Sequence, residues 1–407
     1  MTVSFDREIL GLPFYEPRHV AFAERVDEWC AAHTDLWDVP HEQDEFRERT
    51  VQRILRALGE DGWFAFLDPD AGPDAVADGD FRSLCLGREA LAYTDDTPDN
   101  CFAVHTLAAR PILRFGTEEQ KRRYLPGMAN GTLVGSFALS ERERGSDIAG
   151  LELTAERVGD GYRLNGEKAW IAHGSIADVL CVIARTGEGP GALGLTAFLV
   201  PGTTPGLRVR ERIAAIAPRA FAHLDFEDCD VPADCVLGRP GQGFVVAMDM
   251  LERFRMTVGA AAVGYARRAA DAALAWARSR PMGEGKLFDL PTIKTTFADM
   301  EVKLNAAALL VARAAWEIDR GSRRFSKHSS IAKVYATESA QEIVDAAVQV
   351  FGAAGLVKDS VPERLYRQVR ALRIYEGTTE VQKTVIAAAL DLRRAKAAEQ
   401  RAGAASR

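Results

Sequence analysis

The sequence predicts an α+β fold of three consecutive segments, because the spacing of its apolar residues changes twice along the chain. Residues 1–131 show the 3.6-residue repeat of amphipathic helices. Residues 132–241 contain short apolar runs separated by turn residues, which is typical of a small β-barrel or sandwich. Helical spacing returns in residues 242–394 and predicts a four-helix bundle. The charged tail, residues 395–407, is expected to fray.

The first segment is predicted to be an N-terminal helical domain. Apolar residues recur every three or four positions in Phe22–Cys30 and in Val51–Leu58, so each stretch has one apolar helix face. Two further helices are predicted over Phe81–Tyr93 and Phe102–Phe115.

Turn residues divide the middle segment into candidate strands. Asn165-Gly166 is a favoured pair for a tight hairpin and predicts a turn after the run that ends at Leu164. Gly189–Gly194 matches the dinucleotide-binding pattern GxGxxG, but it lies between two candidate strands and no helix follows. We therefore interpret it as a hairpin loop.

Four long helices are predicted in the third segment. They cover Phe244–Arg278, Thr292–Arg320, Ser326–Phe351 and Thr378–Ala397. Glycine within a helix costs about 1 kcal/mol relative to alanine. Gly264, in the first of these helices, therefore predicts a close contact with a neighbouring helix.

Composition restricts the function without identifying it. The 407 residues carry 51 basic and 58 acidic side chains, and the net charge of −7 argues against general affinity for nucleic acids or anionic membranes. No apolar run approaches the roughly 18–20 residues of a membrane span, and the N-terminus lacks the features of a signal peptide. The six cysteines form no CxxC pair, and the seven histidines show no metal-ligand spacing. We expect a cytoplasmic enzyme without a bound metal.

Two polar stretches are candidates for a functional site. Phe137–Asp147 (FALSERERGSD) is an apolar strand that leads into a polar loop, which could present hydroxyl and backbone N–H groups to a ligand. Ile374–Thr379 (IYEGTT) places Glu376 after an apolar pair. Burial in an apolar pocket would raise the pKa of this carboxyl group toward that of a useful general base. The residues alone favour a solvated carboxylate in a loop over this buried base.

The order and spacing of these two stretches resemble the acyl-CoA dehydrogenase family. Further stretches match it at Asn165–Ile171, Phe226–Pro232, Leu251–Arg255, Val263–Gly264, Val348–Gly352 and Arg367–Thr378. The resemblance extends over residues 15–393. It implies an acyl-CoA dehydrogenase-like fold, FAD as cofactor, and removal of two hydrogens from the Cα–Cβ bond of an acyl thioester.

The resemblance implies that Glu376 takes the α-proton while flavin N5 takes the β-hydride. Some members carry their base on the first bundle helix, where this sequence has Phe254, and Glu252 is two residues out of register. The Glu376 N–H and an FAD ribityl hydroxyl would bind the thioester carbonyl, and Gly377 would allow close approach of the acyl chain.

The resemblance also implies the binding residues. FAD contacts are expected from Phe137, Leu139, Ser140, Ser146, Trp170, Ile171, Ala172 and Thr378. The FAD of a neighbouring subunit is expected to contact Arg280, Gln349, Gly352 and Ala353. Substrate contacts are expected from Ser146, Phe254, Arg255, Tyr375 and Gly377. The active form would then be a homo-oligomer, a dimer or a tetramer, and electron-transfer flavoprotein would accept the electrons.

Three departures from the family pattern affect these expectations. Arg142 and Arg144 stand where the family commonly has proline and alanine, and they could bind phosphate or remain solvated loop charges. Ala172 replaces a hydroxyl residue that bonds the flavin in many members. The usual RxxFG motif reads Arg280–Glu284 without its phenylalanine, and Pro291 replaces a downstream glutamine.

Three alternatives to an acyl-CoA dehydrogenase therefore remain open at the level of sequence. The arginine pair would suit an enzyme that acts only on acyl or peptidyl carrier-protein thioesters. Ala172 would suit an acyl-CoA oxidase that uses oxygen. A flavin-free scaffold is disfavoured, because Glu376, Ser140, Trp170 and Gln349 are all retained.

Overall fold

The computed structural model describes residues 4–39, 44–67, 80–322 and 325–390. The predicted end of the last helix at Ala397 and the predicted frayed tail, residues 395–407, lie outside these ranges. Contacts divide the chain into two compact units, which are described separately. The helical unit is Met1–Asp27, Phe81–Tyr93 and Glu252–Arg407, and the sheet unit is Glu28–Asp80 and Thr94–Leu251.

The sheet unit combines a β-sheet with helices α3 (Glu48–Glu60), α5 (Asp96–Phe115) and α6 (Glu118–Ala129). The Asp95 side chain caps α5 by accepting a hydrogen bond from the N–H of Thr97. Thr117 and Gln120 form a reciprocal capping box at the start of α6. Polar residues of the sequence thus fix where both helices begin.

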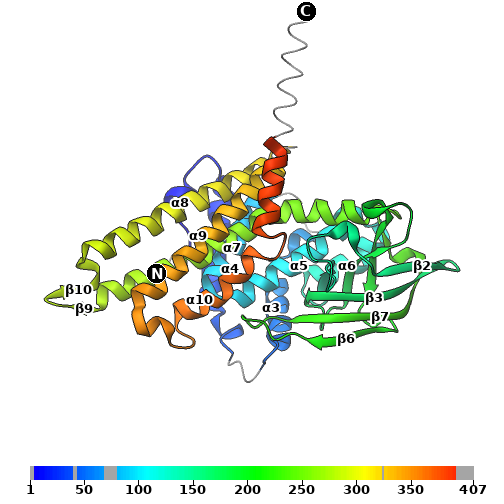
Figure 1. The fold of residues 1–407 in the computed structure, drawn as a ribbon, viewed down its shortest axis with the longest axis horizontal. Helices are drawn as coiled ribbons and strands as arrows, with labels where there is room; N and C mark the ends of the chain where they lie inside the picture. The colour runs from blue at the N-terminus through cyan, green and yellow to red at the C-terminus, as the bar shows by residue number, and fades with distance from the viewer. Residues whose placement is uncertain (1–3, 40–43, 68–79, 323–324, 391–407) are drawn as a thin grey trace, which may run out of the picture. The chain divides into compact units, whose positions relative to one another are not determined.

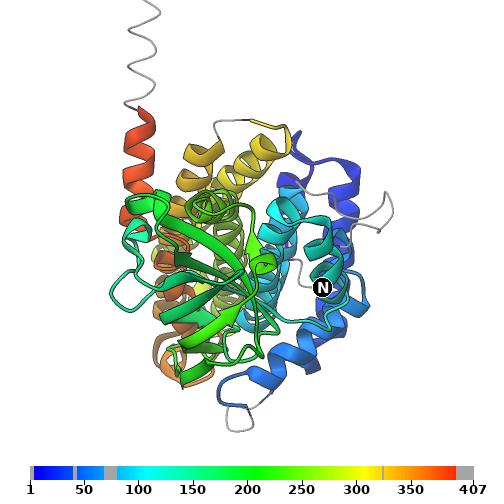
Figure 2. The same ribbon diagram turned by 90° about the vertical axis from the view of Figure 1, so that its right-hand side faces the viewer.

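The strands form one sheet of eight among the described residues. They are β1 (Gly135–Ala138), β2 (Thr154–Val158), β3 (Gly161–Ala172), β4 (Val179–Arg185), β5 (Leu195–Pro201), β6 (Leu207–Arg212), β7 (Phe221–Val231) and β8 (Val236–Leu237). Their order is β6-β7-β3-β2-β4-β5-β8, and β1 pairs in parallel with β4 (Figures 1 and 2). Leu164, Phe198 and Phe226 are fully buried in the core of this unit. Because β4 and β5 pair antiparallel, Gly189–Gly194 joins neighbouring strands, as predicted.

The predicted hairpin at Asn165-Gly166 is wrong. The turn lies earlier, at Gly159, where β2 folds back onto β3 and Val158 pairs with Gly161. Strand β3 continues through Gly166, whose φ of +139° accompanies a register shift against β7. A glycine with positive φ can occur in a bulge as well as in a turn. Here β3 stays paired with β7 on both sides of Gly166, so the glycine forms a bulge.

The helical unit contains the long helices that the sequence predicts. These are α7 (Gly243–Ser279), which begins in the sheet unit, α8 (Pro291–Asp319), α9 (Phe325–Phe351) and a helix over residues 379–390. Helices α8 and α9 pack side by side (Figure 1). The strands β9 (Pro281–Met282) and β10 (Gly285–Lys286) form a hairpin between α7 and α8. None of the helices in the described ranges has the length and hydropathy needed to cross a membrane.

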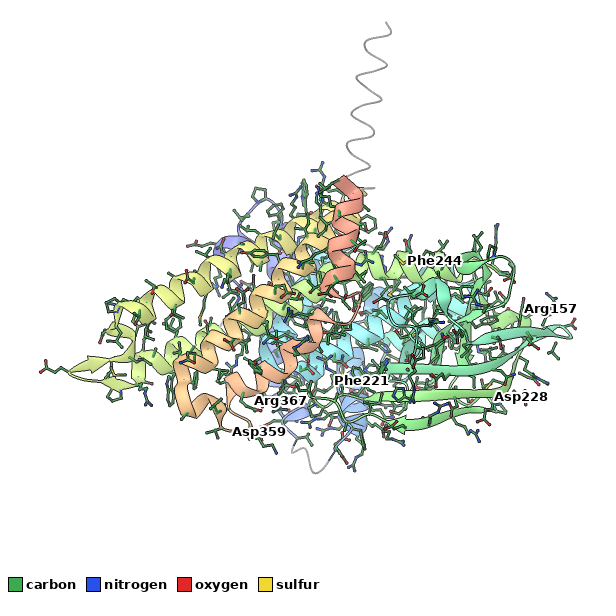
Figure 3. The ribbon with its side chains drawn as sticks, in the orientation of Figure 1. Arg157, Phe221, Asp228, Phe244, Asp359 and Arg367 are labelled. Atoms are coloured by element: carbon green, nitrogen blue, oxygen red, sulfur yellow. The ribbon has the colours of Figure 1, made fainter. Side chains whose placement is uncertain are left out.

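Four further α-helices lie in the described part of the chain: α1 (Arg7–Leu10), α2 (Pro17–Ala32), α4 (Phe81–Thr94) and α10 (Val361–Val369). Helix α10 was not predicted from the sequence. Arg367 on α10 bonds Glu363 one turn earlier at 2.6 Å and pairs with Asp359 at 3.5 Å (Figure 3). These ion pairs secure α10 to the turn before it, and the chain then leads to Ile374–Thr379.

The close helix contact predicted at Gly264 is confirmed. A Cβ atom at this position would lie 2.2 Å from the carbonyl oxygen of Glu89 and 2.9 Å from the backbone nitrogen of Tyr93, both on α4. Real Cβ atoms essentially never approach backbone so closely. Helix α4 therefore packs against α7 at a distance that only glycine permits.

Gly264→Ala should destabilise the protein by roughly 1–3 kcal/mol, because overpacking against backbone outweighs the gain in helix propensity. Thermal unfolding of the holoenzyme would measure the loss. Gly259→Ala, on the same helix, is the comparison variant and should lose less stability, since its Cβ would lie 3.0 Å from a methyl carbon of Val311 and no closer than 3.3 Å to backbone, at the Ala332 carbonyl oxygen. Equal melting temperatures for the two variants would contradict the prediction.

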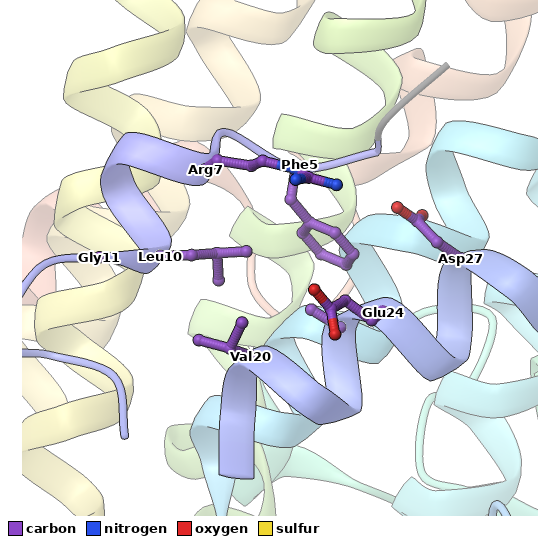
Figure 4. Close-up of a pocket in the computed structure, with 8 residues that line it drawn as sticks. Phe5, Arg7, Leu10, Gly11, Val20, Glu24 and Asp27 are labelled. Carbon is purple, nitrogen blue, oxygen red and sulfur yellow. The ribbon is translucent and has the colours of Figure 1, made fainter. Parts of the chain in front are cut away.

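A cavity of about 200 Å³ lies between α1 and α2 in the helical unit. Its wall includes Phe5, Leu10, Val20 and Asp27 (Figure 4). None of the residues that line it belongs to the predicted site.

Candidate active site

One group of predicted residues gathers where β1 and β3 end in the sheet unit. Its members are Phe137, Leu139, Ser140, Trp170, Ile171 and Ala172. The Ala169 N–H donates to the Ser140 carbonyl at 2.9 Å, and the Ser136 hydroxyl donates to the Ala172 carbonyl at 2.7 Å. These bonds hold the two stretches against each other.

Trp170 has a strained, left-handed backbone and an exposed side chain. Its φ is +63°, although it is not glycine, and its side chain is 55% exposed. The ring lies edge-on to His223, with centroids 4.6 Å apart. A left-handed backbone at such a residue costs about 1–3 kcal/mol, and strain of this kind clusters at functional sites.

The buried ion pair Lys168–Glu141 holds the backbone of this group in place. It was not predicted from the sequence. Lys168 is fully buried and Glu141 is 5% exposed. The Lys168 Nζ donates to Glu141 and to the Leu139 carbonyl, both at 2.8 Å. Glu141 also accepts the N–H groups of Glu152 and Leu153. Burial lowers the pKa of Lys168 to about 8, against the attraction of Glu141.

The loop after Glu141 uses its two arginines differently. Arg144 donates to the Gly150 carbonyl at 3.0 Å and forms an ion pair with Glu152. These contacts tie the start of the loop to its end. Arg142 is half exposed, and its guanidinium lies 3.8 Å from Glu167. Ser146, the predicted cofactor and substrate contact, is exposed in the same loop. Arg142 is the more exposed of the two, with 49% of its side chain accessible against 37% for Arg144.

The residues at the ends of β1 and β3 fit the ring of FAD. An exposed indole offers a stacking surface for a planar heteroaromatic group. The partly exposed Ser140 adds a hydroxyl that can donate or accept a hydrogen bond. This combination of stacking surface and hydrogen-bonding groups is held rigidly by two strands.

A second group of predicted residues lies in the helical unit, in the loop Ile374–Thr378, here called the base loop. Glu376 has φ = +53° and Gly377 has φ = +88°, so two consecutive residues are left-handed. A Cβ on Gly377 would lie 2.4 Å from the Nε2 of Gln382. That buried amide donates to the carbonyls of Glu376 and Gly377 at 3.2 and 3.1 Å. The left-handed backbone at position 377 and the close approach of the Gln382 side chain therefore favour glycine after Glu376.

Lys333 on α9 also binds the base loop, and the sequence analysis missed it. The side chain is 1% exposed, and its Nζ donates to the carbonyl oxygens of Tyr375, at 2.5 Å, and of Gly377. Burial lowers its pKa to about 8; the charge of Glu376 opposes this shift and that of Arg255 adds to it. A lysine within the otherwise apolar stretch Ile331–Val334 was the available signal.

Arg255 is the second buried cation near Glu376. It is 3% exposed, and its Nε and Nη1 atoms have no hydrogen-bond partner among the described residues. Burial lowers its pKa, while the charges of Glu252 and Glu376 oppose the shift. The surroundings of Glu376 thus differ from the apolar pocket that the sequence suggested, because two cations act on its carboxylate.

Phe254, the predicted substrate contact at the alternative base position, is 1% exposed. Its ring meets the edge of Phe81 on α4, with centroids 6.2 Å apart. The structure therefore places Phe254 in the packing between α7 and α4.

A third group lies where α7 and α9 end. Arg280, Gln349, Gly352 and Ala353 are all exposed. Trp276 stacks on Phe351 with centroids 4.8 Å apart, and the Arg280 guanidinium lies 5.5 Å from the centre of the Trp276 ring. The structure thus brings Arg280 to the end of α9, beside the other three residues.

Comparison with known proteins identifies the family. The N-terminal, middle and C-terminal domain models of acyl-CoA dehydrogenase match residues 16–132, 136–229 and 241–390. The mitochondrial short-chain specific acyl-CoA dehydrogenase of Bos taurus is 40% identical over 359 residues, which are 88% of this chain and 86% of that protein.

Two solved structures are similar along almost the whole chain. Butyryl-CoA dehydrogenase from Megasphaera elsdenii has a TM-score of 0.85 at 32% identity, and the match covers 92% of this chain and 98% of that one. The prolyl acyl carrier protein oxidase AnaB has a TM-score of 0.84 at 28% identity, with 92% and 99% covered. The chain belongs to the acyl-CoA dehydrogenase family, the FAD-dependent oxidoreductases that dehydrogenate acyl thioesters.

Proposed function

We propose that Glu376 is the general base that removes the α-proton of an acyl thioester. The base loop carries this proposal, because its left-handed backbone is held by a buried lysine and a buried glutamine. The Glu376 carboxylate accepts the proton, and its peptide N–H donates to the thioester carbonyl, where negative charge develops. FAD, when bound, accepts the hydride from Cβ.

The residues at the ends of β1 and β3 would hold the flavin ring. Trp170 provides the stacking surface, and Ser140 provides a hydroxyl group. Ala172 offers no side-chain donor, so a hydrogen bond to the ring at this position would have to come from peptide groups. The Lys168–Glu141 pair would keep Leu139 and Ser140 in place.

The proposed substrate is a CoA thioester. The similar proteins from Bos taurus and Megasphaera elsdenii are named as acyl-CoA and butyryl-CoA dehydrogenases, which supports this choice. The carrier-only alternative rested on Arg142 and Arg144, and Arg144 is engaged within its own loop. The comparisons do not favour that alternative or the oxidase.

A panel of thioesters tests the substrate. The holoenzyme would be mixed with free acyl-CoA and with the same acyl group on a carrier protein, without oxygen, while flavin absorbance is followed. We expect bleaching by acyl-CoA at a rate at least equal to that with the carrier. Bleaching by the carrier thioester alone would refute the proposal.

We propose electron-transfer flavoprotein as the electron acceptor, since the similar proteins from Bos taurus and Megasphaera elsdenii are named as dehydrogenases. Turnover with this acceptor should greatly exceed turnover with oxygen. Stoichiometric hydrogen peroxide in aerobic turnover would identify an oxidase instead.

We further propose a homo-oligomer in which Arg280, Gln349, Gly352 and Ala353 contact the cofactor of a neighbouring subunit. All four residues are exposed, and the nearby Leu356 is 74% exposed, an apolar surface that an interface would cover. Light scattering on the holoenzyme would separate a monomer from a dimer or tetramer. The cytoplasmic location expected from the sequence is likewise a proposal, testable by cell fractionation.

A further inference from the structure

Lys333 touches the base loop on both sides of Glu376. Its Nζ donates to the carbonyl oxygens of Tyr375 and Gly377, the residues immediately before and after the proposed base. The lysine is 42 residues before Tyr375 in sequence and on a different element, α9. One ammonium group thus fixes the orientation of the peptide groups that flank Glu376.

A second donor holds only part of the same loop. The Gln382 amide bonds the carbonyls of Glu376 and Gly377, but the Tyr375 carbonyl bonds Lys333. Loss of the lysine would leave Gly377 attached to Gln382 and remove the ammonium donor from the peptide before Glu376. That peptide contains the Glu376 N–H, the proposed donor to the thioester carbonyl.

We propose that Lys333 is the positioning residue of the base, which holds the left-handed backbone at Glu376 so that its carboxylate and N–H keep the geometry of the reaction. This proposal rests on the proposed role of Glu376 as base. Lys333 would touch neither substrate nor flavin and would act through the loop alone.

The chemistry of lysine suits this task. An ammonium group has three donors and no acceptor, so it can bond two carbonyl oxygens and still interact with a third group. Burial of a cation is unfavourable unless it is paired. The charged groups that act on Lys333 are Glu376 of the base loop and Arg255 of α7. Glu376 therefore supplies the compensating negative charge, and the charged forms of Glu376 and Lys333 stabilise each other.

Lys333→Met tests the proposal, because methionine fills much of the same space without a donor. We expect kcat to fall by about 10–100-fold, the effect of misplacing a catalytic group by about 1 Å. KM should change less than about threefold, and the flavin content should stay the same. Lys303→Met on α8 is the matched control, since the partly exposed Lys303 pairs with the exposed Glu342 at 2.6 Å, and it should retain wild-type kinetics.

Two further measurements separate positioning from a merely structural role. In Lys333→Met, hydrogen exchange should accelerate at residues 375–377 and remain unchanged in the core of α9. Combining Lys333→Met with Glu376→Gln should lower kcat by less than the product of the two single losses, because the carboxylate that Lys333 positions is already absent and only the N–H remains to be displaced. Multiplied losses, or a kcat equal to wild type, would overturn the proposal.

Lys333→Gln keeps the test decisive if the methionine variant does not fold. Glutamine retains two N–H donors without the charge, so kcat should fall below that of wild type, but by less than the about 10–100-fold expected for complete loss of the donor. An unchanged kcat with unchanged exchange at residues 375–377 would overturn the proposal. Near-normal activity of Glu376→Gln would instead refute the base assignment. The hydrogen-exchange result would still test whether Lys333 holds the base loop.

Discussion

Glutamine in place of Glu376 should lower turnover by at least ~10³-fold while the protein retains FAD. A positioned general base contributes roughly 10²–10⁴-fold, and the amide of glutamine cannot take the α-proton. Glutamine has nearly the same shape as glutamate, so Lys333 and Gln382 can still bind the carbonyls of the base loop. Anaerobic single-turnover bleaching with acyl-CoA measures the chemical step, and the visible spectrum measures the bound flavin.

Glu301→Gln is the matched control for this variant. Glu301 is an exposed carboxylate on α8, away from the base loop in sequence. It should retain full activity. Near-normal bleaching by Glu376→Gln would place the base elsewhere, although the alternative position on α7 carries the buried ring of Phe254 and no carboxylate.

Periodicity was sufficient to predict the long helices of this fold. The predicted helix Phe244–Arg278 and the observed Gly243–Ser279 agree within one residue, because a long apolar stripe with a 3.6-residue repeat has few alternative structures. The hairpin at Asn165-Gly166 failed for a physical reason. A left-handed glycine suits a turn or a bulge, and pairing of β3 with β7, more than 50 residues away in sequence, decides between them.

The candidate site was predicted in part. Motif order pointed to Glu376 and Trp170, and both prove to have left-handed backbones. Lys168 and Lys333 were not predicted, because the carbonyls that they bind lie 29 and 42–44 residues away in sequence. A single sequence does not show such long-range contacts. Charged residues inside apolar strands and helices do mark positions where a buried partner must exist.

Lys168→Met should destabilise the sheet unit by roughly 3–5 kcal/mol, the usual cost of removing one partner of a buried ion pair. It leaves Glu141 buried without its counter-charge and the Leu139 carbonyl without its donor. Because Leu139 precedes Ser140, FAD should also be retained less well. Thermal unfolding and the ratio of flavin to protein measure these two effects.

The matched control is Lys121→Met, which removes an i,i+3 surface ion pair with Glu118 and should alter the melting temperature only slightly. The double variant Lys168→Met/Glu141→Gln should recover only part of the loss. It removes the unpaired charge, but Glu152 and Leu153 donate to different oxygens of the Glu141 carboxylate, and glutamine replaces one of these oxygens with an NH2 group that cannot accept a hydrogen bond. Full recovery would show that the ion pair, and not the hydrogen bonds of Glu141, supports the loop.

The pH dependence of stability gives an independent test of the same pair. Burial lowers the pKa of Lys168 from 10.5 to about 8 in the folded protein. Between these two values the unfolded chain binds more protons at this residue than the folded chain, so the free energy of unfolding rises with pH. Lys168→Met lacks this contribution. The stability difference between wild type and variant should therefore widen from pH 8 toward pH 10.5, and a constant difference over that range would contradict the burial of the ammonium group.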